Sequence, residues 1–164
     1  MTKEKALVFI SETEREMLLL KQCIETIGKR LSSLKEKASK EERAVYVESL
    51  AINLHSFYEG IETIFEKVMD FTGEEKPSGQ EWHREVIERM TLPIKRLRPE
   101  VISVDTAKKL DSYRTFRHKI RHIYGFMIVT ENVITIAEKA WESFESFERD
   151  VKNFISFAEE ITNI

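Results

Sequence analysis

Apolar residues recur every three or four positions over the first seventy residues. From Lys3 to about Leu34 the recurring positions are Leu7, Ile10, Met17, Leu20, Ile24, Ile27, Leu31 and Leu34. From about Glu41 to Phe71 they are Val47, Leu50, Leu54, Phe57, Ile61, Ile64, Phe65 and Val68. This period is that of an amphipathic α-helix, because residues three and four apart share one face. The pattern predicts two long helices.

The prolines and most glycines fall in the middle of the chain. Stretch 72–79 is expected to end the second helix. Ser78 followed by Glu81 has the form of a capping box, which predicts a short helix through Met90. The segment LPIKRLRPE, residues 92–100, is predicted to be an irregular connector because its two prolines disfavour regular helix.

Two further helices are predicted in the last third. One is capped by Ser103 or Asp105, ends near Gly125 and carries the apolar stripe Leu110, Tyr113, Phe116, Ile120 and Ile123. The other runs from about Asn132 to Ile161 and carries Trp141, Phe144, Val151, Phe154, Ala158 and Ile161. No stretch predicts a pair of strands. We therefore expect an all-α fold, an antiparallel up-and-down four-helix bundle with an additional short helix between the middle pair.

Size and charge narrow the class of protein. A chain of 164 residues is expected to form one domain, residues 1–164. Its net charge of -3 disfavours non-specific adhesion to nucleic acid or to anionic membranes, so only a local basic patch could bind such a partner. No run approaches the roughly 20 apolar residues that span a bilayer. The single Cys23 cannot form an internal disulfide, and we expect a cytoplasmic protein without a membrane partner.

One segment departs from the acidic balance. Residues 112–130 contain no Asp or Glu and hold Arg114, Arg117, His118, Lys119, Arg121 and His122. The apolar stripe predicts that Arg114, Arg117, His118 and Arg121 form one outward ridge. This ridge could bind an anion. It could also be a solvated face whose counterions lie on another helix, at Glu59, Glu62 or Glu66.

Arginine and histidine together can cleave RNA without a metal, because arginine neutralises the phosphate and histidine transfers a proton near neutral pH. His122 lies about 140° round a regular helix from Arg117, so the two converge only if the helix tightens before Gly125. His118 and His122 could instead be paired metal ligands, but they lack a third ligand. We expect no metal and no other cofactor.

The spacing Arg117-x4-His122-x-Tyr124 resembles the signature of HEPN-domain toxins of the HepT type. The segments LHSFYEGIETIFEKV, PSGQEWHREVIERM and LDSYRTFRHKIRHIYGF are also similar to this branch. The resemblance covers at least residues 50–126 and implies a HEPN-like fold.

The resemblance implies a homodimeric, metal-independent endoribonuclease toxin, with a minimal nucleotidyltransferase as its antitoxin. By position, Arg117 would hold the phosphate, His122 would be the acid/base, and Tyr124 would be the residue that the antitoxin modifies with AMP. Charge alone assigns RNA contacts to Arg114, His118, Lys119 and Arg121. The alternative is a non-catalytic substrate-binding or partner subunit of a nucleotidyltransferase.

Overall fold

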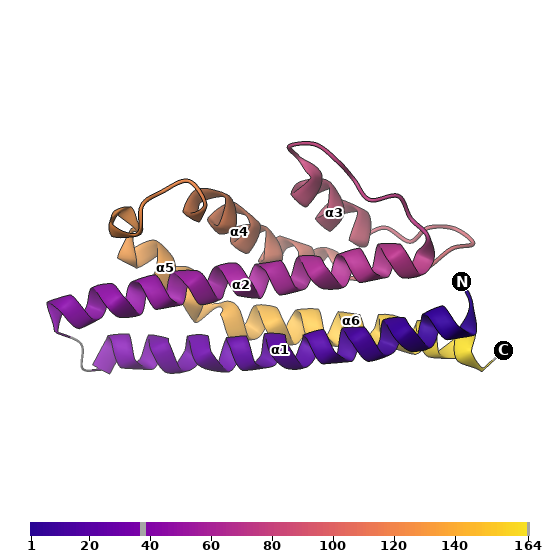
Figure 1. Ribbon diagram of the computed structural model, residues 1–164, viewed down its shortest axis with the longest axis horizontal. Coiled ribbons are helices and arrows are strands. Elements are labelled where there is room, and N and C mark those ends of the chain that lie inside the picture. The colour runs from indigo at the N-terminus through magenta and orange to yellow at the C-terminus, as the bar shows by residue number, and fades with distance from the viewer. Residues whose placement is uncertain (37–38, 164) are drawn as a thin grey trace.

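Helices account for most of the chain in the computed structural model, which describes residues 1–36 and 39–163 (Figure 1). The α-helices are α1 (Lys3–Glu36), α2 (Lys40–Thr72), α3 (Trp82–Met90), α4 (Val104–Ile120), α5 (Thr130–Glu138) and α6 (Ala140–Thr162). A 3₁₀ helix, η1, spans Gly125–Met127. Within the described residues there is one isolated β-bridge, between Ile94 and Arg98, and no strand.

The helices form the expected antiparallel bundle. In Figure 1, α1, α2 and α6 run lengthwise beside one another, α3 and α4 lie over α2, and both termini are at the same end. Helix α3 contacts both α2 and α4, so it is the additional helix of the predicted fold. The all-α four-helix bundle is confirmed.

Aromatic side chains fill the core where the long helices meet. Phe57 packs edge-on against Tyr113 of α4 with ring centroids 5.3 Å apart, and Phe65 packs in the same way against Phe147 of α6 at 5.8 Å. Gly60 lets α1 approach α2, because a Cβ at this position would lie 2.6 Å from the Leu20 side chain. The two aromatic pairs join α4 and α6 to α2, and the close approach at Gly60 joins α1 to it.

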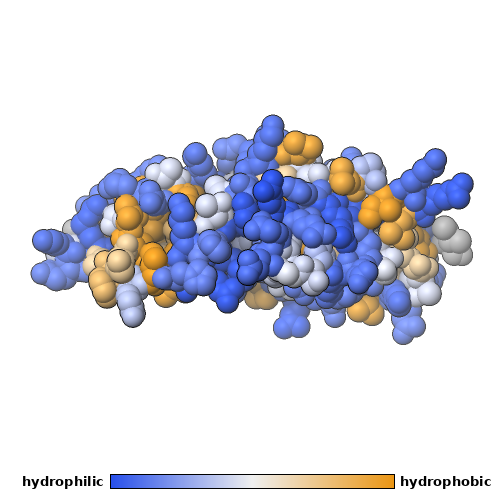
Figure 2. Space-filling model, turned by 90° about the horizontal axis from the view of Figure 1, so that it is seen from above, coloured by the Kyte–Doolittle hydropathy of each residue, from blue (hydrophilic) through white to orange (hydrophobic). Residues whose placement is uncertain are grey.

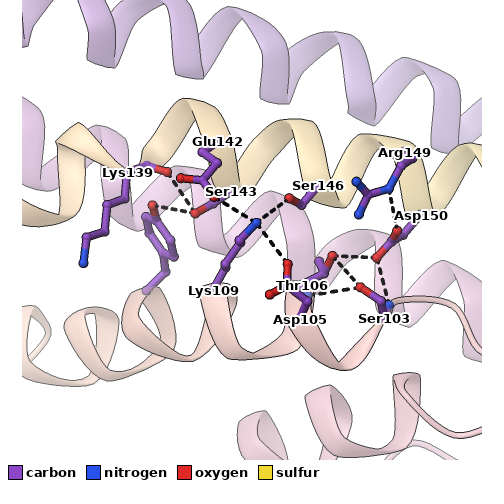
Figure 3. A network of polar contacts seen from close by, with 11 residues as sticks. Ser103, Asp105, Thr106, Lys109, Lys139, Glu142, Ser143, Ser146, Arg149 and Asp150 are labelled. Carbon is purple, nitrogen blue, oxygen red and sulfur yellow. Dashed lines mark hydrogen bonds and ion pairs between the residues drawn. The ribbon is translucent and has the colours of Figure 1, made fainter.

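The N-terminus of α4 is held by a buried polar network (Figure 3). Ser103 is the N-cap, and its hydroxyl accepts a hydrogen bond from the Thr106 backbone N–H at 3.2 Å. The Asp150 carboxylate on α6 accepts from the Ser103 N–H at 2.8 Å and from the Thr106 hydroxyl at 2.6 Å. These bonds satisfy donors that a helix N-terminus leaves open. They fix where α4 begins relative to α6.

The last predicted helix is broken, contrary to expectation. Helices α5 and α6 meet at Lys139, the residue between them. The Tyr113 hydroxyl donates to the Ile136 carbonyl at 3.3 Å, and the Ser143 hydroxyl donates to the Lys139 carbonyl at 2.9 Å. These side chains bond carbonyls at the break, which stabilises the change of direction. Trp141, predicted to be in the core, follows this break and is 48% exposed.

The prediction that a capping box at Ser78 and Glu81 opens the short helix was wrong. The capping box lies at Ser39 and Glu42, where α2 begins, whereas α3 begins after Glu81 without a side-chain cap. Gly79, at φ +103°, is part of a turn that delays the start of α3 beyond Ser78.

Helix α4 ends at Ile120 and not near Gly125. The His122 N–H bonds the Lys119 carbonyl at 3.2 Å, and the Ile123 N–H bonds that of Ile120 at 3.4 Å. These three-residue steps tighten and end the helix, which leaves Ile123 exposed.

None of the described helices combines the length and apolar character that a membrane-spanning helix requires. Cys23 is half-buried and donates its thiol to the Asn53 carbonyl at 3.2 Å. Burial raises the pKa of this thiol to about 11, as expected of a structural and not a reactive cysteine.

Candidate functional site

Three helices bring a carboxylate, an imidazole and a guanidinium together in the upper layer of the bundle. Glu62 comes from α2, His83 from the first turn of α3, and Arg117 from the last turn of α4. Arg117 Nε lies 3.5 Å from Glu62 Oε2, and Arg117 Nη1 lies 3.1 Å from His83 Nε2. His83 Nδ1 contacts Glu62 Oε1. Each side chain therefore touches the other two.

The direction of these hydrogen bonds follows from the arginine. A guanidinium only donates, so His83 Nε2 must be the acceptor from Arg117. The proton of a neutral imidazole is then on Nδ1, from where it is donated to Glu62 Oε1. The contacts are those of a neutral His83 in its Nδ1–H form.

Burial shifts the pKa values of Glu62 and His83. It raises the pKa of Glu62 to about 7, although the Arg117 charge opposes the shift. It also lowers the pKa of His83 to about 4, and the Arg117 charge adds to that shift. A low pKa keeps His83 neutral at pH 7, in agreement with its acceptor role.

The cluster leaves two buried polar atoms without a hydrogen-bond partner among the described residues. These are Tyr58 Oη, one helical turn before Glu62, and Arg117 Nε, which is near Glu62 but makes no hydrogen bond. Buried polar atoms are rarely left unbonded, since each costs free energy. A site that is incomplete in this way has capacity for another polar group.

Beyond Arg117 the chain is exposed and basic. His118, Lys119, Arg121 and His122 all face solvent, and within the described part of the chain none of them forms an ion pair. The rings of His118 and His122 lie edge-to-face with centroids 5.3 Å apart. Both line a pocket of about 450 Å³ between the end of α4 and the start of α5, whose other walls are mostly apolar. Uncompensated positive charge at this turn favours an anionic partner.

The turn after His122 exposes hydrophobic side chains. Tyr124 is 72% exposed and stacks on Phe126, with ring centroids 5.6 Å apart. Ile123, Met127 and Val129 are exposed beside them. Figure 2 shows hydrophobic surface on the left side of the molecule, where this turn lies in Figure 1, as well as on its right side. Contiguous exposed apolar surface of this kind is typical of interaction sites.

The structure corrects the expected outward position of Arg117. Its side chain is only 13% exposed and is paired with Glu62 on α2. Glu62 was one of the counterions considered in the solvated-face interpretation, and this ion pair is present, but Arg117 does not lie on a solvated face. Arg114 pairs instead with Asp111 on its own helix, at 2.7 Å. The helix does tighten before Gly125, yet no hydrogen bond or ion pair joins Arg117 to His122 within the described chain.

The comparison with models of known protein families identifies the family of this chain. A family model described as HepT-like protein matches residues 49–158, which is well over half of the chain. The chain belongs to the HepT-like family. Neither the curated proteins nor the solved structures contain a match to this HepT-like chain. The matched range includes α3, α4 and the turn up to Tyr124, so the whole candidate site lies inside it.

Metal-binding geometry is absent from the described part of this HepT-like protein. No three His, Cys, Asp or Glu side chains gather there where they could hold an ion. His118 and His122 are neighbours, as their spacing indicated, but no third such side chain joins them.

The site contains residues that sequence reasoning did not place there. Neither His83 nor Tyr58 was among the site residues that the sequence predicted. One signal was present for Glu62: it lies four residues after Tyr58 and three before Phe65, so it shares a helix face with aromatic residues, where a buried carboxylate needs a partner. The sequence predicted the short helix between the middle pair but not which of its faces meets α4, so the contact of His83 with Arg117 was not predicted.

Proposed function

We propose that this HepT-like protein is a metal-independent endoribonuclease toxin whose catalytic residues are Arg117 and His122. The observation that carries the proposal is the Arg117-x4-His122-x-Tyr124 spacing, located where α4 ends in a turn of exposed basic residues that form no ion pair with the described part of the chain. A fixed guanidinium beside such a turn suits the binding of a phosphodiester.

The proposed reaction uses the RNA's own nucleophile. The 2′-hydroxyl oxygen bonds to the adjacent phosphorus as the P–O5′ bond breaks, giving a 2′,3′-cyclic phosphate and a 5′-hydroxyl. One proton leaves the 2′-oxygen and one is delivered to the 5′-oxygen. His122 is the acid/base, and Arg117 stabilises the charge on the phosphorane. Arg114, His118, Lys119 and Arg121 contact the RNA backbone.

Arg117 and His122 point to different surroundings within one chain, which favours a dimeric site. Arg117 faces Glu62 and His83, whereas His122 lines the pocket between α4 and α5. In a homodimer, His122 of one chain could act with Arg117 of the other. Sedimentation should show a dimer at micromolar concentration, and a monomer would contradict this part of the proposal.

Cleavage of a broad RNA pool in EDTA tests the activity. We expect the wild-type protein to leave 2′,3′-cyclic phosphate ends and His122→Ala to lose cleavage by about 100-fold or more. His55→Ala is the matched control, because His55 is a half-buried histidine on α2 paired with Glu59 at 3.3 Å. A His122→Ala variant that is as active as the wild type would remove His122 from the mechanism.

The exposed turn after α4 favours the second candidate, a partner subunit that docks a nucleotidyltransferase. Stacked Tyr124 and Phe126 offer the hydrophobic surface that protein interfaces use. Docking there would also present the Tyr124 hydroxyl to an antitoxin that transfers AMP. The hydroxyl oxygen would bond to the α-phosphorus of ATP, and pyrophosphate would leave. A tight complex without RNA turnover, even after removal of any AMP from Tyr124, would favour this second function over the first.

A further inference from the structure

We propose that His83 of α3, together with Glu62 of α2, positions the guanidinium of Arg117 for the phosphate. This inference rests on the proposed function only in naming phosphate as the group that Arg117 meets. It assigns a role to the additional short helix of the bundle, which carries His83 between α2 and α4.

The first step concerns what holds His83 itself. Its ring lies 3.9 Å, centroid to centroid, from that of the preceding Trp82, with 34° between the ring planes. Its Nδ1 is bonded to Glu62 Oε1, and only 20% of its side chain is exposed. The imidazole is thus packed on one side and hydrogen-bonded on another, which restricts it to one orientation.

The second step concerns what this orientation does to Arg117. An arginine side chain has many rotamers, and this freedom is lost when it closes on a ligand. His83 Nε2 accepts from Nη1 at 3.1 Å, while Glu62 Oε2 lies 3.5 Å from Nε. The hydrogen bond at Nη1 and the ion pair at Nε restrict both the direction and the rotation of the planar group, while Nε itself makes no hydrogen bond to a described residue. Part of the ordering is therefore complete before a phosphate arrives.

The third step concerns charge. A protonated His83 would present an N–H to the N–H of Arg117 at 3.1 Å, so their contact would be lost. Arg114, Arg121 and His118 from α4 also disfavour a charged ring, and Glu62 is the carboxylate that faces it from α2. A neutral imidazole can orient a cation without cancelling the charge that the phosphate needs. A second carboxylate in its place would cancel that charge.

Two substitutions separate this positioning role from a role in folding. His83→Gln places an amide near the position of Nε2 and can still accept from Arg117, whereas His83→Asn reaches only towards the position of Nδ1. We expect His83→Asn to lower kcat for RNA cleavage by about 10- to 100-fold with KM changed by less than about 3-fold. His83→Gln should retain most of the activity, and His55→Gln should retain all of it. Equal activities of His83→Asn and wild type, or equal losses in His83→Asn and His83→Gln, would overturn the proposal.

A spectroscopic measurement does not depend on activity. In protein labelled with ¹⁵N, His83 should show a protonated Nδ1 and a bare Nε2 at pH 7, and the Arg117 Nε–H signal should shift in His83→Asn but not in His55→Gln. A doubly protonated or Nε2–H ring would overturn the positioning role. A wild-type protein that cuts no RNA but shows these signals would remove the proposed ribonuclease function and leave the positioning of Arg117 intact.

Discussion

Helix α4 has a buried polar cluster at each end, and the two clusters differ in how completely their hydrogen bonds are made. At its N-terminus, the Asp150 carboxylate accepts from the Ser103 N–H and the Thr106 hydroxyl, and contacts Arg149 (Figure 3). At its C-terminus, Arg117 meets Glu62 and His83, while Tyr58 Oη and Arg117 Nε have no hydrogen-bond partner within the described chain.

The pKa values of the carboxylates in the two clusters are shifted in opposite directions. Burial opposes the ionisation of both, but the hydrogen bonds from Thr106 and Ser103 outweigh it and lower the pKa of Asp150. At Glu62, burial outweighs Arg117, and the pKa rises to about 7. The N-terminal cluster stabilises the ionised form of Asp150 and thereby the fold. The C-terminal cluster disfavours the ionised form of Glu62. This difference favours a structural role for the N-terminal cluster and supports the proposal that Arg117 at the other end binds phosphate, since shifted pKa values are typical of functional sites.

Removal of the Asp150 carboxylate should have the largest effect on stability. Asp150→Ala leaves the Ser103 N–H and the Thr106 hydroxyl without their charged acceptor, so we expect the free energy of unfolding to fall by about 3 kcal/mol. Urea unfolding measures this change. Glu145→Ala is the control, because Glu145 is an exposed carboxylate on the same helix. A loss below about 1 kcal/mol would show that the N-terminal cluster does not hold α4 in place.

The two carboxylates should affect stability in opposite pH ranges. Glu62 has a folded pKa of about 7 against an ordinary 4.5, so its contribution is present below pH 4.5 and is lost as the pH rises to 7. Asp150 has a lowered pKa, so its contribution is present above its ordinary 3.8 and is lost as the pH falls below that.

Substitution by the neutral amide should isolate each range. Relative to Glu62→Gln, the wild type should lose on the order of 2 kcal/mol of unfolding free energy between pH 4.5 and 7. Relative to Asp150→Asn, it should lose stability only below about pH 4. Urea unfolding across pH 3 to 8 measures both differences. Parallel curves for wild type and Glu62→Gln would mean that Glu62 has an ordinary acidity.

The N-terminal cluster was partly predictable and the C-terminal one was not. Ser103 was expected as a cap because a serine before an amphipathic stretch is a local signal. Its partner Asp150 lies 47 residues away, and periodicity alone does not pair residues across helices. The same periodicity predicted the bundle, since apolar stripes must be buried.

Arg117 shows where local reasoning fails. The stripe through Tyr113, Phe116 and Ile120 placed it outward, but α3 and α2 cover that side of α4 and supply His83 and Glu62. The motif spacing located the residue without indicating its environment. The end of α4 was also misplaced, because hydrophobic Ile123 continues the stripe after the backbone has left the helix.

Removal of one hydroxyl from each cluster tests, with the smallest expected effects, whether the two clusters differ in the completeness of their hydrogen bonds. Thr106→Val removes a hydroxyl that accepts from Ser103 at 3.0 Å and donates to Asp150 at 2.6 Å, so we expect a loss of about 1.5 kcal/mol in unfolding free energy. Tyr58→Phe removes a buried hydroxyl that lies near Glu62 and lowers the pKa of that carboxyl, but that has no hydrogen-bond partner of normal geometry in the described chain, so the change should be within about 0.5 kcal/mol of zero. Both changes keep the shape of the side chain, which leaves hydrogen bonding as the main difference. If Tyr58→Phe cost as much as Thr106→Val, the Tyr58 hydroxyl would have to be bonded in solution, and the C-terminal cluster would be as complete as the N-terminal one.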